Sequence, residues 1–291
     1  MATVSVVVVT YNALPWLERC LESVAGYETI VVDHGSADAS VEVARRHGAQ
    51  VIEQENRGFG AGNNVGMRAA SGDYFLLLNA DAWAVGDAVE RLVACAEAHP
   101  EAAVVGPRLS NEDGTLQRSA RGFPTLWRLA TEYFFLRKLA PSSRLLNAFY
   151  AGGFDHRHER EVDWLYGPAL LVRRQAADAV GLFDESFFLF SEETDWCYRF
   201  RAAGWKVLFF PGAEVVHVGG ASHGGRLYVE NLRGQLRFLA KHRGPREAER
   251  ARRLLLAALR LRALIFRGAR GRQYRDAAAF LASGSAQALL S

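Results

Sequence analysis

Over its first 106 residues the chain alternates between short apolar runs and longer stretches whose apolar residues have helical spacing. This alternation restricts the fold more than any other feature of the sequence. The run at residues 4–9 is continuous and β-branched, which is typical of a strand buried on both faces. Residues 14–24 follow with apolar side chains on one face, as in an amphipathic helix.

The same two patterns recur along this half of the chain. We expect strands at residues 4–9, 29–32, 50–53, 74–78 and 102–105, and helices at 14–24, 39–47, 62–70 and 87–99. Repeated strand–helix units produce a mostly parallel sheet with right-handed crossovers. The predicted fold class is therefore α/β, and ligands of such sheets bind beyond the carboxyl ends of the strands.

The second half of the chain is less regular. Residues 111–114 have the composition of a hairpin turn, and residues 145–160 that of a long loop. The remaining expected elements are helices at 127–139, at 192–203 and from residue 226 onward, and strands at 165–172 and 205–210.

Composition disfavours several classes of protein. Apolar residues make up 49% and charged residues 23% of the 291, so long disorder is not expected. The N-terminus lacks the pattern of a signal peptide, and no apolar run is long enough for a spanning helix. The three cysteines, Cys20, Cys95 and Cys197, are far apart, so their spacing fits neither a disulfide framework nor a zinc site. We therefore expect a cytoplasmic location.

Charge is distributed unevenly along the chain. The whole chain carries +3, but residues 241–275 hold twelve Lys and Arg against two Glu, a local charge of +10. The other residues must then carry −7. A basic end on an acidic body favours an anionic partner for the C-terminal segment.

Polar residues follow three of the predicted strands. Asp33 follows the second strand, a Gly-rich loop at residues 56–64 follows the third, and Asp81 follows the fourth. A carboxylate there can accept hydrogen bonds from a nucleoside or hold Mg²⁺ or Mn²⁺ on a diphosphate, although a turn explains either aspartate equally well. The loop lets backbone amides approach a phosphate. It does not match the dinucleotide fingerprint, which would follow the first strand, so a nicotinamide enzyme is disfavoured.

Two later features also bear on chemistry. Glu192, Glu193 and Asp195 open a predicted helix beside an aromatic run. Acids this close, next to apolar bulk, raise one another's pKa and suit a general base, although acids in a first turn also simply stabilise a helix. His217 lies near His223 and several glycines, and imidazole can ligate a metal or contact phosphate.

Taken in order, these motifs resemble glycosyltransferase family 2, the inverting enzymes of GT-A fold. The resemblance covers about residues 3–240. It rests on Thr10-Tyr11-Asn12, residues 33–38, 56–66, 78–81, 163–174, 183–188 and 192–197, and His217.

The resemblance implies a role for each motif. Glu193 occupies the position of the catalytic base, and Asp81 with His217 would hold the divalent cation, Mg²⁺ or Mn²⁺. The residues implied on the nucleotide and donor side are Thr10, Tyr11, Asn12, Asp33, Arg57, Gly58, Gly60, Asn63, Asn79 and Asp81. Those implied on the acceptor side are Trp164, Gly167, Glu192, Asp195 and Trp196.

Within this family the chain is most similar to the rhamnosyltransferase branch of bacterial cell-envelope synthesis. That similarity implies transfer of L-rhamnose from dTDP-rhamnose to a hydroxyl of an envelope or polysaccharide acceptor. The alternatives are a UDP- or GDP-sugar donor with another acceptor and, less favoured, a sugar nucleotidyltransferase or a non-catalytic nucleotide-binding protein. The chain departs from the family's usual residues at His34, Asn79 and Glu193, which bears on cation affinity and donor identity.

The resemblance also implies a domain division. A catalytic domain would span residues 1–240, with a nucleotide-binding half at 1–106 and an acceptor half at 107–240, followed by a basic amphipathic helical tail at 241–291. Leucines and arginines alternate in that tail, which fits the inner face of an anionic membrane beside a lipid-linked acceptor. It fits packing on the catalytic domain or a homodimer interface equally well. Nucleic acid is disfavoured, because no aromatic stacking platform accompanies the arginines.

Overall fold

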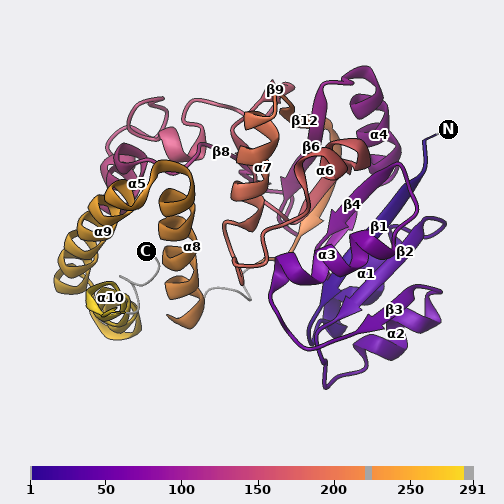
Figure 1. Cartoon of the computed structure of the whole chain (residues 1–291), viewed down its shortest axis with the longest axis horizontal. Coiled ribbons are helices and arrows are strands. Elements are labelled where there is room, and N and C mark those ends of the chain that lie inside the picture. The colour runs from indigo at the N-terminus through magenta and orange to yellow at the C-terminus, as the bar shows by residue number, and fades with distance from the viewer. Residues whose placement is uncertain (1, 220–224, 285–291) are drawn as a thin grey trace. The chain divides into compact units, whose positions relative to one another are not determined.

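The apolar run near the N-terminus forms β1 (Val4–Thr10), a strand inside a ten-stranded sheet (Figure 1). The structure, a computed structural model, describes residues 2–219 and 225–284. The main path of the sheet has the order β3-β2-β1-β4-β11-β6-β12-β5. Its strands are β2 (Glu28–Asp33), β3 (Gln50–Glu53), β4 (Tyr74–Leu78), β5 (Ala82–Ala84), β6 (Ala102–Ser110), β11 (Ala169–Arg173) and β12 (Lys206–His217), besides β1.

Most strands on this path point the same way. The pairs β1–β2, β2–β3, β1–β4 and β6–β12 are parallel, whereas β11 runs antiparallel to β4 and β6, and β5 runs antiparallel to β12. The predicted α/β class with a mostly parallel central sheet is confirmed. Two short strands, β7 (Leu116–Gln117) and β9 (Arg160–Glu161), pair with β6 and β12 off the path, and β8 (Ala120–Arg121) pairs with β10 (Trp164–Leu165) separately.

The chain divides into two units, each described by itself. The first consists of Met1–Ala120, Asp155–Phe188 and Asp195–Gly219, and the second of Arg121–Phe154, Leu189–Thr194 and Gly220–Ser291. The predicted domain division at residues 106 and 240 stays a prediction.

Helices cover both faces of the sheet in the first unit. Alternate side chains of β1, including Val6 and Val8, belong to one apolar core with α1 (Leu14–Glu22), α2 (Ser40–Arg46) and α4 (Ala88–Ala98). Val7 points to the other face and contacts α3 (Phe59–Ala69), where a Cβ on Gly66 would come within 2.3 Å of Val7 Cγ1. This period of two explains why β1 is apolar throughout. The unit also holds α6 (Arg174–Val180) and most of α7 (Glu192–Ala202).

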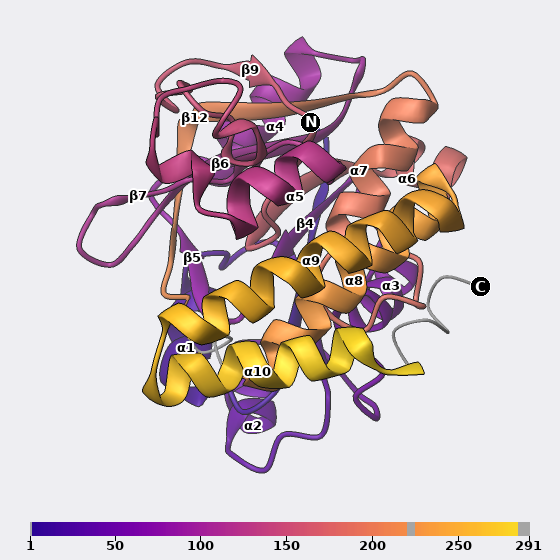
Figure 2. The ribbon, with the colours of Figure 1, turned by 90° about the vertical axis from the view of Figure 1, so that its left-hand side faces the viewer.

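The second unit is helical. Three long helices, α8 (Gly225–Arg243), α9 (Pro245–Ile265) and α10 (Gly268–Ala282), pack side by side (Figure 2). Arg262 fastens α9 to α5 (Leu126–Tyr133), because its Nε donates to the Tyr133 carbonyl at 2.8 Å and its guanidinium lies 4.2 Å from the ring centroid of Phe135. Two short 3-10 helices, η1 (Leu136–Lys138) and η2 (Ala148–Tyr150), complete the unit.

The structure corrects several expected boundaries. The predicted helix at 127–139 is wrong in extent: α5 ends at Tyr133, and Phe135 has a φ of +63°, which cannot continue a right-handed helix. Strands β6 and β12 run well beyond the predicted 102–105 and 205–210, and β5 was not expected. Over the residues described, no helix is both long and apolar enough to span a bilayer.

Candidate active site

The carboxyl ends of β1, β2 and β4 meet at one edge of the sheet. Thr10 and Asp33 are partners in the register of β1 and β2, and Asn79 directly follows β4. Thr10 Oγ1 and Asn79 Oδ1 are buried, and neither has a hydrogen-bond partner among residues 2–219 and 225–284. Buried polar atoms normally have partners, so this edge offers unused polar contacts to a ligand.

Asp33 is almost fully buried and holds the turn after β2. Its Oδ2 accepts hydrogen bonds from the backbone amides of Gly35 and Ser36 at 2.9 and 2.8 Å, and its Oδ1 accepts one from the Ser36 hydroxyl. The turn interpretation of this aspartate therefore describes its contacts. Oδ1 keeps a further lone pair, so a nucleoside contact remains a proposal.

Asn12 joins the loop after β1 to the loop after β2. It adopts a left-handed backbone with φ of +52°. Its backbone N–H donates to Ser36 Oγ, and its side-chain Oδ1 accepts from Ala37 N–H, both at 2.8 Å. Tyr11, beside it, is 57% exposed. Asn12 thus shapes the edge, while Tyr11 presents a free aromatic face.

Asp81 and His217 come together because β5 pairs with β12. Ala82 and His217 are register partners, which brings His217 Nε2 to 3.3 Å from Asp81 Oδ1. The other ring nitrogen, Nδ1, lies 2.9 Å from Gln117 Oε1. Gln117 Nε2 in turn donates to the His217 carbonyl at 2.7 Å and to Asn111 Oδ1 at 2.6 Å.

These contacts fix which nitrogen of His217 carries a proton. The Gln117 amide has two carbonyl acceptors at its nitrogen, so its oxygen must face Nδ1, and Nδ1 must donate. In the neutral ring, Nε2 then presents a lone pair to the Asp81 carboxylate. Two acceptors facing each other at 3.3 Å need a proton or a cation between them. The pair therefore fits a divalent cation held by one carboxylate and one imidazole, with Gln117 orienting the ring.

The charge of Asp81 is consistent with this role. Burial raises the pKa of Asp81, but a hydrogen bond and charge from a protonated His217, with the backbone amides of Asp81 and Gly219, outweigh burial and hold the pKa below its ordinary value. A cation between the two side chains would take the place of that His217 proton. Asp81 is thus ionised near neutral pH, as a cation ligand must be.

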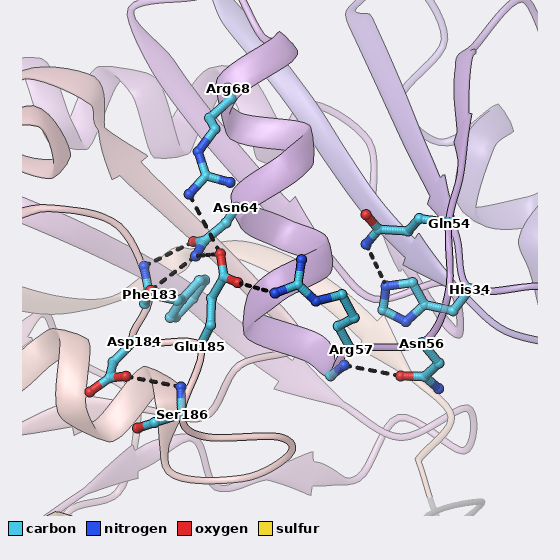
Figure 3. Close-up of polar contacts among 11 residues, drawn as sticks. His34, Gln54, Asn56, Arg57, Asn64, Arg68, Phe183, Asp184, Glu185 and Ser186 are labelled. Carbon is cyan, nitrogen blue, oxygen red and sulfur yellow. Dashed lines mark hydrogen bonds and ion pairs between the residues drawn. The ribbon is translucent and has the colours of Figure 1, made fainter.

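The Gly-rich loop is anchored by residues distant in sequence. Figure 3 shows the Glu185 carboxylate contacting Asn64 Nδ2 at 3.1 Å and the guanidinium groups of Arg57 and Arg68, each at 3.5 Å. Gly58 has a φ of +104°, and a Cβ there would lie 2.3 Å from the Phe188 carbonyl oxygen. Only glycine fits this position. Arg57 remains exposed and can contact a ligand.

Other predicted donor-side residues lie inside α3. Gly60 is buried in its first turn, and Asn63 is buried with its side-chain amide donating to the Phe59 carbonyl at 3.0 Å. His34 is buried beside this helix, within 3.1 Å of Gln54 Nε2, and burial lowers its pKa despite the charge of Asp33 (Figure 3). These residues support the loop and its helix.

The predicted acceptor-side residues of the first unit have mixed surroundings. Trp196 is buried and donates from Nε1 to the Gly181 carbonyl at 2.7 Å, and Asp195 accepts a hydrogen bond from Arg199 Nε at 2.8 Å. Both therefore have structural partners. Trp164 is buried in β10, and Gly167 lies in the turn between β10 and β11.

Glu192 and Glu193 belong to the second unit and are both buried. Each has one carboxyl oxygen without a hydrogen-bond partner in the described chain. Burial raises the pKa of Glu193 to about 7, although the backbone amides of Glu193 and Thr194 and the charge of Arg121 act in the other direction. Burial and the charge of Glu193 raise the pKa of Glu192 well above its ordinary range. Glu193 therefore titrates where a general base is effective.

A strained turn places these two acids. Phe190 and Ser191, which precede α7, have φ values of +68° and +71°, a left-handed conformation that costs energy in non-glycine residues. Gly234 of α8 lies against this turn, since a Cβ on it would be 2.5 Å from the Phe190 carbonyl oxygen. The close approach of α8 holds the turn in place.

A sequence profile described as glycosyl transferase family 2 matches residues 5–162. The chain belongs to this family. It is 32% identical over 232 residues to N-acetylglucosaminyl-diphospho-decaprenol L-rhamnosyltransferase of Mycobacterium tuberculosis, which covers 73% of this chain and 75% of that protein. It is 24% identical over 258 residues to rhamnosyltransferase WbbL of Escherichia coli K12, covering 82% and 94%. The expected family and its rhamnosyltransferase branch are confirmed.

A solved structure agrees with the predicted fold. The mannosyltransferase PcManGT of Pyrobaculum calidifontis, in complex with GDP-Man and Mn²⁺, matches with a TM-score of 0.57 and 17% identity, over 99% of this chain and 85% of that one. The family 2 member described here therefore has the GT-A fold and is an enzyme, a glycosyltransferase.

Sequence patterns missed Gln117 and gave no role to Glu185, which lies in the 183–188 motif; the structure brings both into the candidate site. Gln117 orients His217, and Glu185 holds the Gly-rich loop. Gln117 follows the hairpin turn at 111–114, and nothing in the sequence singles it out. His223, which the sequence placed near His217, lies outside the described residues.

Proposed function

We propose that this glycosyltransferase moves L-rhamnose from dTDP-rhamnose to a hydroxyl of a lipid-linked or polysaccharide acceptor, with inversion at the anomeric carbon. The names of its relatives support the sugar, and one of them acts on a diphospho-decaprenol. UDP- and GDP-sugars are the alternatives, since PcManGT binds GDP-Man.

The main support for a nucleotide-sugar donor site is that two hydrogen-bond acceptors, Asp81 Oδ1 and His217 Nε2, face each other at the carboxyl edge of the sheet. These two residues would hold Mg²⁺ or Mn²⁺, which supplies positive charge against the diphosphate as it leaves. Thr10 Oγ1 and Asn79 Oδ1 offer unused contacts at the same edge. In this proposal Asp33 and Tyr11 contact the nucleoside.

On the acceptor side, the proposal assigns the general base to Glu193 from its own environment. With a pKa of about 7, a large fraction of the Glu193 carboxyl is ionised at neutral pH, and this carboxylate is a stronger base than an ordinary glutamate. The acceptor oxygen attacks the anomeric carbon and forms the new C–O bond, while the bond from that carbon to the phosphate oxygen breaks. The hydroxyl proton goes to the Glu193 carboxylate, and the nucleoside diphosphate leaves with the bonding electron pair.

The test is a donor-hydrolysis screen across dTDP-, UDP- and GDP-sugars, with Mg²⁺, with Mn²⁺ and with chelator. We expect cation-dependent release of dTDP from dTDP-rhamnose. Asp81→Asn should abolish it, and Asp87→Asn is the matched control, because Asp87 is an exposed aspartate paired only with Arg91 on α4 in the described contacts. Hydrolysis of another donor in preference would refute the rhamnosyl assignment. Full activity of Asp81→Asn would remove Asp81 from the cation site.

We also propose that the end of α9 contacts an anionic membrane. Three apolar side chains there are exposed to solvent, Leu261 at 42%, Leu264 at 83% and Ile265 at 57%, and the neighbouring Arg260 and Arg267 are exposed as well. This combination suits the interface of an anionic bilayer. The other face of α9, including Leu255 and Leu259, is buried within the second unit. The helix thus has a packed face and a free apolar end.

Flotation with phosphatidylcholine vesicles, with and without phosphatidylglycerol, tests this contact. We expect the chain to float only with the anionic vesicles and Leu264→Asp to stay at the bottom. Val85→Asp is the control, because Val85 is an exposed apolar residue of the first unit. Equal recovery of Leu264→Asp and the parent chain would disprove the membrane contact.

A further inference from the structure

A second group of metal-ligating side chains lies away from the proposed donor site. Cys95 and His99 are four residues apart at the end of α4, with the His99 amide donating to the Cys95 carbonyl at 3.1 Å. This spacing places both side chains on one face of the helix. Glu159, in the loop before β9, completes the group, and one ligand atom of each residue lies within 4.8 Å of the others.

The group lies at the opposite edge of the sheet from Asp81. Strands β4 and β6 point the same way, because each is antiparallel to β11. Asp81 lies just beyond the carboxyl end of β4, whereas the His99 carbonyl accepts from Ala102 N–H at the amino end of β6. Both positions belong to the first unit. The group is therefore separate from the chemistry already described.

Its geometry is close to that of a tetrahedral metal site. Metal–ligand bonds of about 2.0–2.3 Å put ligand atoms about 3.3–3.6 Å apart. His99 Nε2 lies 2.8 Å from Glu159 Oε1, and Cys95 Sγ lies 4.0 Å from Glu159 Oε2, so the observed distances bracket those values. Small side-chain movements would bring all three into coordination.

The imidazole also has an outer partner. His99 Nδ1 lies 3.5 Å from Glu101 Oε1, and Glu101 is paired with Lys206 Nζ at 3.2 Å. A carboxylate on the outer nitrogen turns the inner nitrogen toward the metal, as is usual for histidine ligands. This contact orients Nε2 toward Glu159.

We propose that Cys95, His99 and Glu159 bind one zinc ion. Sulfur, imidazole and carboxylate together select Zn²⁺ over Mg²⁺, which takes only hard oxygen ligands. Cys95 is buried, whereas the side chains of His99 and Glu159 are 32% and 38% exposed, which leaves the fourth position to water. The ion links the loop before β9 to α4, and so stabilises the segment that begins at Asp155, where the chain returns to the first unit. Cysteine spacing alone did not indicate this site, because two of its ligands are not cysteines.

Titration of the metal-free chain with Co²⁺ tests the proposal. Cobalt bound by a thiolate gives a near-ultraviolet charge-transfer band, and we expect it to saturate at one equivalent. The band should be lost in Cys95→Ser and retained in Cys20→Ser, a control at a buried cysteine whose Sγ contacts the Asn79 carbonyl. A cation at Asp81 and His217 has no sulfur ligand and gives no such band, so the result is independent of the transferase assignment. Absence of the band, or its persistence in Cys95→Ser, would overturn the proposal.

A second set of measurements tests the site even if Cys95→Ser does not fold. Glu101→Gln leaves all three ligands in place, removes the charge of the outer partner of His99 together with the exposed ion pair to Lys206, and should weaken zinc binding about 10–100-fold, measured by competition with a chromophoric chelator. Addition of Zn²⁺ should raise the Tm of the parent chain and not that of His99→Ala. An unchanged zinc affinity in Glu101→Gln together with no Zn²⁺-dependent rise in Tm would refute the site.

Discussion

Replacing Glu193 by glutamine should change how the stability of the chain depends on pH. The pKa of this buried carboxyl is raised from 4.5 to about 7 in the folded chain. The folded state therefore favours the neutral form. Its contribution to stability is fully present below the unfolded pKa of 4.5 and is lost as the pH rises through 7.

The size of the effect follows from the two pKa values. At 1.36 kcal/mol per pKa unit, ionisation of Glu193 should lower the free energy of unfolding by about 2–3 kcal/mol between about pH 5 and pH 8. Glutamine does not titrate, so the variant lacks this loss and keeps only the pH dependence of the other groups, including Glu192, whose pKa burial still raises. Any fixed cost of the new amide cancels, because the comparison is between slopes and not between absolute stabilities.

The assay is urea unfolding of the parent chain and of Glu193→Gln at several pH values. We expect the variant to gain about 2–3 kcal/mol on the parent across that range, while its transfer rate falls about 10²–10⁴-fold. Glu112→Gln, at an exposed glutamate of the 111–114 hairpin, should follow the parent in both respects. The parent's kcat/KM should rise with pH around 7. Identical pH slopes for parent and Glu193→Gln would show that this carboxyl is not destabilised by burial.

Three other substitutions test contacts described above. In Gly234→Ala the new Cβ must displace the Phe190 carbonyl by about 1 Å, so kcat should fall by up to about 10²-fold with donor KM unchanged. An unchanged kcat would show that the position of this turn does not affect catalysis. Gly58 has a φ of +104° and lies against the Phe188 carbonyl, so Gly58→Ala should lower the free energy of unfolding in urea by about 2–3 kcal/mol. A smaller loss than that caused by a Gly→Ala change at an exposed glycine would show that the new side chain is not strained. Arg262→Met removes the guanidinium donor from the Tyr133 carbonyl and one of two donors from the Glu132 carbonyl, which still accepts from Phe135 N–H, and should cost about 2–3 kcal/mol. An unchanged Tm would show that water replaces the guanidinium.

The fold was largely predictable because its signals are local. β1, β2 and β4 contain apolar runs between helices of ordinary spacing, and such runs determine both strand and buried face. The elements that were missed lack a local signal. β5 has only three residues and forms because β12 pairs with it. The helix α5 ends just before Phe135, whose left-handed backbone cannot be predicted from the local sequence.

The candidate site was predictable only in part, for a similar reason. Asp33 and Asp81 follow strands, so their place at the sheet edge could be inferred from the pattern. The partner of His217 could not, because Gln117 is a hundred residues away in sequence and is brought there by β7 and β12, which both pair with β6. A raised pKa for one of the clustered acids beside apolar residues was predicted, but that Glu193 has it, mainly through burial, depends on tertiary packing.

If Asp81 and His217 hold the proposed cation, the Gln117 contact places control of that site in a surface hairpin. The amide that fixes the His217 tautomer stands on the short strand after the 111–114 turn, and one of its two acceptors is Asn111 of that turn. Exchanging this amide for a carboxylate would favour a doubly protonated imidazole, which repels cations. Relatives could therefore change metal preference by substituting residues of the hairpin while both ligands stay the same.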